Sequence, residues 1–275
     1  MIEARNLWKT FGDHTVLERI NITVSEGEFV TLVGASGCGK TTFLKMLLGV
    51  ESVSRGTLNL DGVAIPQEPG SDRGVVFQQY SVFPHMSVLE NVVAAIGFQK
   101  RGFSGYLFGQ DKTRAHEQSM QMLEKVGLTQ SVNKYPHELS GGMRQRLAIA
   151  QALLVQPRIL LLDEPFGALD PGIRADMHAL VLDLWREHKL TVFMVTHDLK
   201  EGFHLGTRLW VFDKPRIDPH APEAYGATIT YDLPISQERR DSKLLEDLST
   251  QQAVKPLDDQ ILADANASNA KGTNN

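Results

Sequence analysis

A glycine-rich stretch carries the clearest chemistry in this chain, with the order Gly34-Ala35-Ser36-Gly37-Cys38-Gly39-Lys40-Thr41. Its glycines allow the backbone to curl so that successive N–H groups face phosphate oxygens, and the helix that follows adds its positive N-terminal end. The Lys40 ammonium would neutralise the β- and γ-phosphates of a bound nucleotide, and the Thr41 hydroxyl would ligate Mg²⁺. A structural turn can share this composition, but the position between a strand and a helix favours a phosphate site, which we extend to Thr42.

Two carboxylates directly follow an apolar strand at residues 159–162. A buried parallel strand delivers the residues after it to the carboxyl edge of its sheet, where ligands bind in α/β folds. There Asp163 would hold Mg²⁺ through water, and Glu164 would polarise the attacking water molecule. An acidic pair alone could merely cap a helix, but its combination with the glycine-rich loop favours catalysis.

A second helix start suited to an anion lies in residues 139–146, with the order Leu-Ser-Gly-Gly-Met-Arg-Gln-Arg. Ser140 stands where an N-cap hydroxyl would, and Gly141 and Gly142 expose the first amides of the helix. The alternative is an N-capped helix that binds no ligand.

With this third motif the sequence resembles the ABC ATPase family, whose signature motif is LSGGQ. Met143 takes the last position here, which leaves the Ser-Gly-Gly part of the motif intact. The resemblance extends over residues 1 to about 212, with the motifs in family order. A small-molecule kinase with a phosphate-binding loop would not explain residues 139–142.

The resemblance implies roles for four further residues. Phe11 matches the aromatic residue that stacks on adenine, although a core phenylalanine is the alternative. Gln78 matches the glutamine that contacts Mg²⁺ and the coupling groove, and Asp170 closes a Gly-Ala-Leu-Asp segment at the dimer interface. His197 matches the switch histidine near the γ-phosphate, although a lone histidine after a strand is usually structural.

The resemblance also implies partners. Two subunits would pack head to tail, with each ATP between the glycine-rich loop of one and Ser140, Gly141 and Gly142 of the other. ATP would close the dimer and hydrolysis would reopen it, moving integral membrane permease subunits that dock on the helical part. A solute-binding protein would complete such an import system.

The branch of the family is suggested by two segments. Residues 79–92 look like bacterial import systems, and residues 163–171 are similar to the nitrate, sulfonate and taurine branch. A small anion or organic solute would then be the cargo. A lipid-export or cell-division ABC ATPase is the alternative, as is a soluble ABC ATPase that acts on ribosomes or DNA.

The elements around these motifs predict an α/β core with a parallel sheet and an inserted helical subdomain. The resemblance implies that this is a P-loop NTPase (ABC ATPase) core with an N-terminal antiparallel β-subdomain. Strands are expected at residues 21–24, 28–33, 57–60, 75–77, 159–162, 191–195 and 208–212, and helices at residues 40–48, 110–126, 141–155, 173–188 and 198–205.

We divide the chain into four parts: the first part of the nucleotide-binding core, the helical subdomain, the second part of the core and a polar, disordered tail, at residues 1–80, 81–157, 158–235 and 236–275. Ser87 and Glu90 have capping-box spacing and open a helix that we expect to run through Ile96. Residues 97–109, rich in glycine and aromatics, are expected to form a loop.

Composition agrees with a globular protein that reaches a membrane only through partners. The chain has 275 residues, 42% of them hydrophobic, and a net charge of −5 that gives no general attraction to nucleic acid. Cys38 is its single cysteine, so a redox role there lacks a second thiol. No stretch approaches the roughly 20 apolar residues that span a bilayer, and residues 1–7 lack a secretory signal. We expect a peripheral position on the cytoplasmic face of the membrane, without the extra regulatory domain of sugar-type importers.

Lys40→Ala should weaken the affinity for ATP, because it removes a mobile cation from the phosphate cradle. Calorimetric titration of wild type and variant with ATP measures the effect. An unchanged affinity in the variant would refute the assignment of the phosphate-binding loop.

Overall fold

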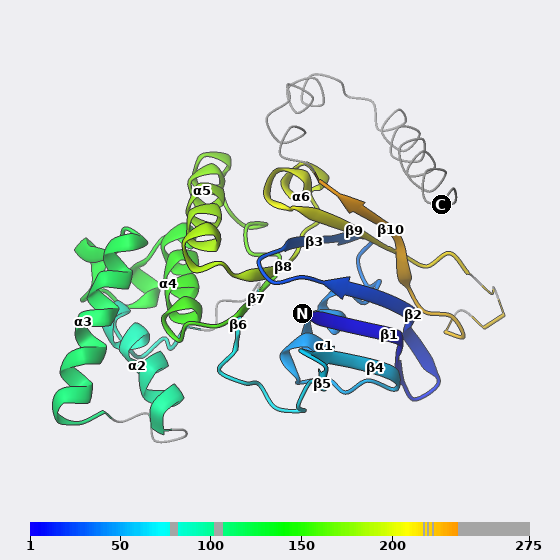
Figure 1. Cartoon of the computed structure of the whole chain (residues 1–275). Coiled ribbons are helices and arrows are strands. Elements are labelled where there is room, and N and C mark those ends of the chain that lie inside the picture. Colours follow the sequence, from blue (N-terminus) through cyan, green and yellow to red (C-terminus); the bar gives the residue numbers. More distant parts are fainter. Residues whose placement is uncertain (78–81, 102–106, 217, 219, 222, 236–275) are drawn as a thin grey trace.

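Two β-sheets and a lateral block of helices make up the part of the chain that the computed structural model describes, residues 1–77, 82–101, 107–216, 218, 220–221 and 223–235 (Figure 1). The smaller sheet is antiparallel, with the strand order β2-β1-β4-β5. Its strands are β1 (Ile2–Phe11), β2 (His14–Val24), β4 (Arg55–Leu60) and β5 (Val63–Ala64). Because β1 and β2 form a hairpin, Phe11 lies at its tip, paired with His14.

The larger sheet has six strands in the order β10-β9-β3-β8-β7-β6. All neighbouring pairs are parallel except β10 with β9, which is antiparallel. The strands are β3 (Phe29–Gly34), β6 (Arg73–Val76), β7 (Ile159–Asp163), β8 (Thr191–Val195), β9 (Arg208–Asp213) and β10 (Thr228–Pro234). Every residue of β7 and β8 is buried, as expected for central strands covered on both faces.

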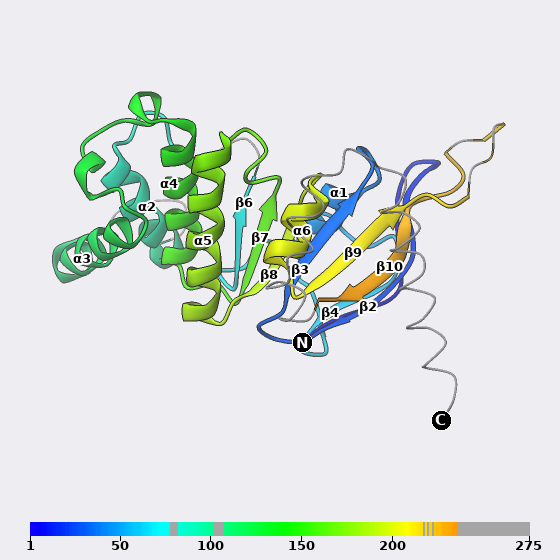
Figure 2. The same cartoon turned by 90° about the horizontal axis from the view of Figure 1, so that it is seen from above.

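Helices cover both faces of this sheet and extend beyond it (Figures 1 and 2). The helices α2, α3 and α4 form the lateral block, α4 packs against β6 and α5, and Figure 2 shows α5 beside α4 next to the sheet. The bounds are α1 (Lys40–Leu48), α2 (Val88–Arg101), α3 (Gly109–Lys125), α4 (Gly141–Leu154), α5 (Pro171–His188) and α6 (Leu199–Leu205), with 3₁₀ turns at Thr129–Ser131 and Pro136–Glu138.

Strand β7 divides the apolar interior into two clusters, because successive side chains of a strand point to opposite faces. Leu160 and Leu162 pack with residues of α4 and α5. Ile159 and Leu161 pack with α1 and with the smaller sheet. The alternation explains how one strand can serve as the centre of both halves of the fold.

The end expected for the helix after Ser87 is wrong. The capping box itself is confirmed: Ser87 N donates to Glu90 Oε2 at 2.7 Å, and Glu90 N donates to Ser87 Oγ at 3.3 Å. The helix α2 nevertheless continues beyond Ile96 to Arg101, so the loop expected at residues 97–109 is wrong in its first part. Ile96 packs against residues of α3. The free energy gained by this burial outweighs the roughly 1 kcal/mol that Gly97 costs within the helix.

Several predictions concern residues outside the described part. Residues 102–106 of the expected loop lie there, as do the proposed tail at residues 236–275 and the boundary expected at residue 80. The division into four parts therefore stays a prediction. The sequence pattern did not predict β10, an edge strand whose residues are mostly half-buried and so present no clean apolar face.

Residues 223–227 join the two sheets by running along the outer edge of β2. Thr15 N donates to the carbonyl of Glu223 at 2.9 Å, and Glu18 N donates to the carbonyl of Ala227 at 2.9 Å. Glu18 is buried, and its Oε1 accepts from Arg216 Nε at 3.0 Å and Nη2 at 2.5 Å. The same guanidinium lies 4.3 Å from the ring centre of Tyr225.

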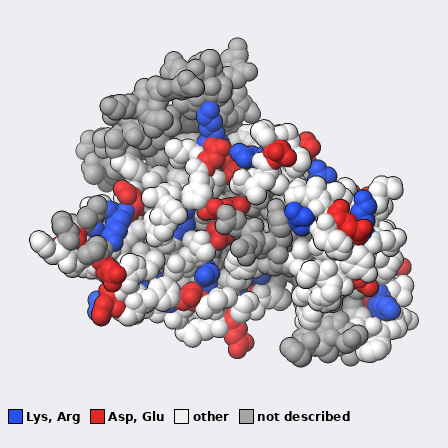
Figure 3. Space-filling model, turned by 180° about the vertical axis from the view of Figure 1, so that it is seen from behind, with Lys and Arg blue, Asp and Glu red and all other residues white. Residues whose placement is uncertain are grey.

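The surface carries charges of both signs. Figure 3 shows acidic and basic side chains interspersed over the face opposite to that of Figure 1. The net charge of the whole chain is −5. Within the described residues, no helix is long and apolar enough to cross a membrane.

Arg216→Met should lower the free energy of unfolding by about 1–3 kcal/mol, because it leaves the buried Glu18 carboxylate without its partner. Urea unfolding measures the change. Adding Glu18→Gln should recover part of the loss, since a neutral amide is easier to bury than a charge. Arg5→Met is the control, because Arg5 pairs with Glu3 at an exposed site. Equal losses in both arginine variants would contradict the role of the buried pair.

Candidate nucleotide site

The glycine-rich loop has a backbone that side chains would obstruct. Gly34, Gly37 and Gly39 have φ of 144°, 80° and 89°, values that L-residues rarely adopt. A Cβ at Gly34 would lie 2.1 Å from the carbonyl oxygen of Phe212, and one at Gly39 would lie 2.6 Å from Leu17 Cδ2. The loop therefore forms a tight curl whose inner side is lined by backbone, the geometry that a phosphate group requires.

Lys40 lies within this curl and is buried. Its Nζ donates to the carbonyl oxygens of Gly34 at 2.8 Å and Ala35 at 2.9 Å, and it lies 3.6 Å from Cys38 Sγ. These bonds hold a cation at the start of α1, where the helix dipole also favours an anion. Lys40 is the first residue of α1, Thr42 follows it within the helix, and Ser36 lies in the loop before it.

Thr41 links the loop to the end of β7. Its Oγ1 donates to Asp163 Oδ1 at 3.1 Å, across 122 residues of sequence. Burial raises the pKa of the Asp163 carboxyl above its ordinary value, and the charge of Glu164 adds to this effect. The hydrogen bond from Thr41 and the charges of Lys45 and Lys40 act in the opposite direction on that pKa.

The Thr41 hydroxyl and the Asp163 carboxylate are hard oxygen donors of the kind that Mg²⁺ prefers. No cluster of three or more metal-binding side chains occurs among the described residues. Mg²⁺ beside a nucleotide needs no such cluster, because it usually takes one or two protein ligands together with phosphate oxygens and water. The two residues therefore fit a metal that is shared with a bound phosphate.

Glu164 and His197 contact each other at the same edge of the sheet, the imidazole Nε2 meeting the carboxylate Oε1. Glu164 has a φ of 48°, and its backbone N donates to the carbonyl of Val195 at 3.0 Å, which ties it to the end of β8. The two side chains border an open hollow of about 690 Å³ that also reaches Arg174 and Lys200. The expected catalytic pair is thus assembled on the carboxyl side of neighbouring strands.

Phe11 lies on the β1–β2 hairpin and is 47% exposed, so it is not a core residue. The Lys9 ammonium lies 4.5 Å from the centre of its ring. A Cβ at Gly39 would lie 2.9 Å from Cγ1 of Val16, which belongs to the same hairpin. The hairpin therefore packs against the start of α1. Sequence reasoning missed Val16, because only the folded hairpin brings it to the loop.

The signature residues form a helix start of the expected kind. Ser140 is the N-cap of α4, and its Oγ accepts from Met143 N at 3.3 Å. Gly141 is half-buried and Gly142 is buried, and a Cβ at Gly142 would lie 2.4 Å from Ile173 Cγ2 of α5. Ser140 is exposed, and Figures 1 and 2 show α4 well away from α1, on the far side of α5, β6 and β7.

Two other residues complete the expected set. Asp170 is the exposed N-cap residue of α5, and its side chain makes no capping hydrogen bond. Gln78 lies outside the described residues, directly after Phe77. The structure therefore brings the loop, Asp163, Glu164 and His197 together through β3, β7 and β8, and leaves Ser140 and Asp170 on outward helix starts.

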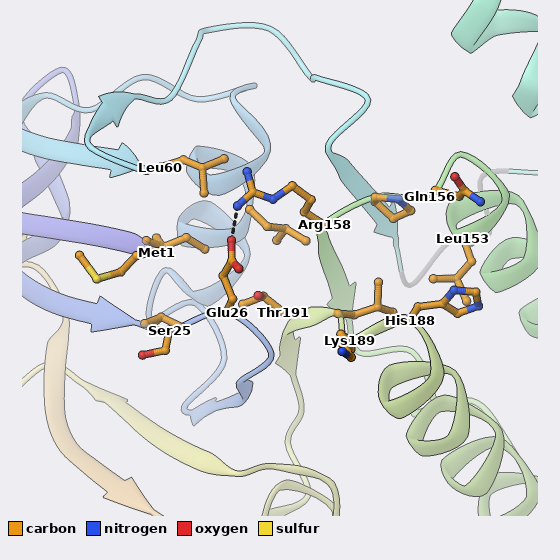
Figure 4. Close-up of a pocket in the computed structure, with 15 residues that line it drawn as sticks. Met1, Ser25, Glu26, Leu60, Leu153, Gln156, Arg158, His188, Lys189 and Thr191 are labelled. Carbon is orange, nitrogen blue, oxygen red and sulfur yellow. Dashed lines mark hydrogen bonds and ion pairs between the residues drawn. The ribbon is translucent and has the colours of Figure 1, made fainter.

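A separate hollow of about 360 Å³ lies at the opposite, amino edge of the larger sheet (Figure 4). Ile159 and Thr191, the first residues of β7 and β8, line it. Its most prominent polar contact is the ion pair between Arg158 and Glu26. Because ligands of open α/β sheets bind at the carboxyl ends of the strands, we do not assign the nucleotide to this hollow.

Comparison with known proteins agrees with this geometry. Residues 17–167 match the family described as ABC transporter. The chain is 41% identical over 238 residues to the bicarbonate transport ATP-binding protein CmpD of Synechocystis sp., covering 86% of this chain and 78% of that protein. It is 38% identical over 227 residues to the nitrate import ATP-binding protein NrtD of the same organism, covering 82% and 79%.

A solved structure resembles this fold over nearly the whole length of the solved chain. It is the dimeric structure of a post-hydrolysis state of the ATP-binding cassette MJ0796 bound to ADP and Pi. The TM-score is 0.69 at 28% identity, covering 86% of this chain and 99% of that one. The antiparallel sheet, the larger sheet and the helical block are therefore features of a known cassette fold.

Asp163→Asn should leave the ligand-free protein at least as stable as wild type at neutral pH. The pKa of Asp163 is higher in the folded chain than its ordinary value of 3.8, so ionisation costs stability above the folded pKa. The cost fades as the pH falls and is absent below the unfolded pKa. A ligand at 100 times its Kd stabilises the folded protein by about 2.7 kcal/mol, and the variant should lose the part of this stabilisation by ATP that depends on Mg²⁺.

Thermal unfolding from pH 3 to pH 8, with and without ATP and Mg²⁺, measures both effects of Asp163→Asn. Asp183→Asn is the control, since Asp183 lies on the exposed face of α5 beside Arg186. A metal-dependent stabilisation of Asp163→Asn equal to that of wild type would contradict the proposed metal ligand.

Proposed function

Since the chain belongs to the ABC transporter family and is one of its ATPases, we propose that it drives solute import as one half of a dimer that closes around two ATP molecules. The observation that carries this proposal is the convergence of three motifs at one sheet edge. Lys40 lies in the loop, Thr41 reaches Asp163, and Glu164 contacts His197 beside them. This set supplies phosphate binding, metal ligation and a base in neighbouring positions.

For hydrolysis, we assign the base to Glu164 and the positioning of the γ-phosphate to His197. Thr41 and Asp163 would hold Mg²⁺, which would supply positive charge to offset the negative charge that develops on the phosphates. Lys40 and the loop amides of residues 34–41 would hold the phosphates. Glu164 would orient and deprotonate the attacking water, which typically contributes about 10²–10⁴ to the rate.

The separation of the two proposed anion-binding helix starts supports a dimer. Within one chain, Ser140 precedes α4 and Lys40 begins α1. These two helices stand apart in both views (Figures 1 and 2). A head-to-tail partner would bring its Ser140, Gly141 and Gly142 to the phosphates held by Lys40. Asp170 would lie at the same interface, and the dimeric cassette structure supports this arrangement by fold.

Membrane permease subunits would dock on the helical block. A hollow of about 370 Å³ there is lined mainly by α2 and the turn before it, with Met86, Leu89 and Val93 among its apolar residues. His85 and Glu90 add polar groups at its border. An apolar hollow with a polar border suits a short helix of a permease. The chain would thus be held peripherally on the cytoplasmic face of the membrane.

The cargo that the relatives support is a small anion or organic solute. Two relatives are named for bicarbonate transport and nitrate import, and another, at 42% identity over 226 residues, is a spermidine/putrescine import protein of Chromobacterium violaceum. The latter match spans 60% of that protein's length. We favour the nitrate, sulfonate and taurine type, with a solute-binding protein delivering the cargo to the permease.

Glu164→Gln should reduce ATP hydrolysis by about 10²–10⁴ while leaving ATP binding intact, because the amide keeps the shape but cannot act as the base. Binding without hydrolysis should trap the closed dimer. Size exclusion with and without ATP and Mg²⁺ should therefore show a dimer only with nucleotide. Hydrolysis at the wild-type rate would refute the catalytic assignment, and a variant that stays monomeric with ATP would refute the isolated dimer.

A second substitution tests which subunit Ser140 serves. In the Glu164→Gln background, Ser140→Arg should abolish the nucleotide-dependent dimer while the monomer still binds ATP. The bulky cation would then obstruct only the partner's site. Loss of ATP binding in the monomer would place Ser140 in its own subunit's site and contradict the head-to-tail arrangement.

A further inference from the structure

A chain of buried polar groups ties the segment that carries His197 to helix α5. Thr196 Oγ1 donates to Glu201 Oε2, and Glu201 Oε1 lies 2.8 Å from His178 Nε2. The side chains of Glu201 and His178 are only 6% and 13% exposed. Both carboxylate oxygens are thus engaged inside the protein, where each such bond is strengthened by the low dielectric.

This chain fixes both neighbours of His197. Thr196 Oγ1 also accepts from Asp198 N at 3.1 Å. Asp198 in turn caps α6, its Oδ1 accepting from Lys200 N at 2.9 Å and Glu201 N at 3.3 Å. His197 is therefore the outward-facing member of a tripeptide whose other two residues are locked to α6.

His178 also reaches the segment that follows Glu164. Its ring packs edge-on against Phe166, with the ring centres 4.9 Å apart. Phe166 is fully buried and lies two residues after Glu164. The ring of His204 stands 5.8 Å away on the side of α6. One imidazole on α5 therefore contacts the supports of both members of the Glu164–His197 pair.

We infer that His178 is a positioning residue for ATP hydrolysis. Through Glu201 and Thr196 it holds the His197 segment, and through Phe166 it holds the turn after Glu164. It thereby sets the separation of the two catalytic side chains without touching ATP. The inference rests on the proposed function, in which Glu164 and His197 act on the γ-phosphate. A misplacement of about 1 Å in such a pair can cost about 10²-fold in rate.

The test compares His178→Leu with His178→Gln. Leucine fills much of the space but leaves Glu201 Oε1 without its donor, so kcat should fall about 10- to 100-fold. KM and the calorimetric Kd for ATP should stay within about twofold of wild type, because the phosphate-binding loop is unchanged. Glutamine can still donate to Glu201 and should restore most of kcat. His188→Leu is the matched control. His188 lies on the same helix and its Nε2 has no hydrogen-bond partner among the described residues, so the kcat of the variant should equal that of wild type.

A second pair of variants serves if His178→Leu does not fold. Thr196→Val keeps the shape and removes the hydroxyl, whereas Thr196→Ser keeps the hydroxyl. A loss of kcat in the valine variant alone, with unchanged ATP Kd, supports the inference. A wild-type kcat in folded His178→Leu or in Thr196→Val overturns it, as does an equal loss in His188→Leu. An inactive wild-type protein would overturn the proposed function and the inference together, whereas an active one with unaffected variants overturns the inference alone.

Discussion

The hydrogen bond from Thr41 to Asp163 joins the first turn of α1 to the last residue of β7. It brings together two segments that are far apart in the sequence and that approach only because β3, β8 and β7 are neighbours in one parallel sheet. Because β7 is buried along its length, its polar residue lies at its end, where the Asp163 carboxylate accepts a hydrogen bond from the Thr41 hydroxyl. The pKa of Asp163 is raised because burial disfavours its charged form, and a bound divalent cation would favour that form.

In the proposed dimer, the nucleotide site would be incomplete in one copy of the chain. The loop with Lys40, and the pair Glu164 and His197, face the carboxyl edge of the sheet, whereas Ser140 and Asp170 start helices that point outward. In that dimer the division of the site would couple hydrolysis to motion, because a nucleotide bound by two surfaces favours the state in which they meet. Hydrolysis of the nucleotide would then change the relative stability of the open and closed states.

Local patterns in the sequence were enough to predict the elements whose ends are marked by residues that start or stop a helix or strand. Helix α1 begins at Lys40 and ends before Gly49 as expected, because glycines with positive φ border it on both sides. The motifs could be placed for the same reason, although the roles of their residues stay proposals. What the pattern could not supply were contacts made by the fold: Val16 beside Gly39, or His178 beside Glu201. Those side chains belong to no motif, and only packing of distant segments reveals them.

The absence of a side chain at Gly142 has a mechanical consequence. Ile173 of α5 fills the space that a Cβ at Gly142 would need. The Ile173 side chain therefore packs directly against the backbone at the beginning of α4. Ser140 and Asp170 immediately precede these beginnings. In the proposed dimer, a displacement of the helical block would therefore move both residues together, so that the two surfaces facing the partner subunit would shift at the same time.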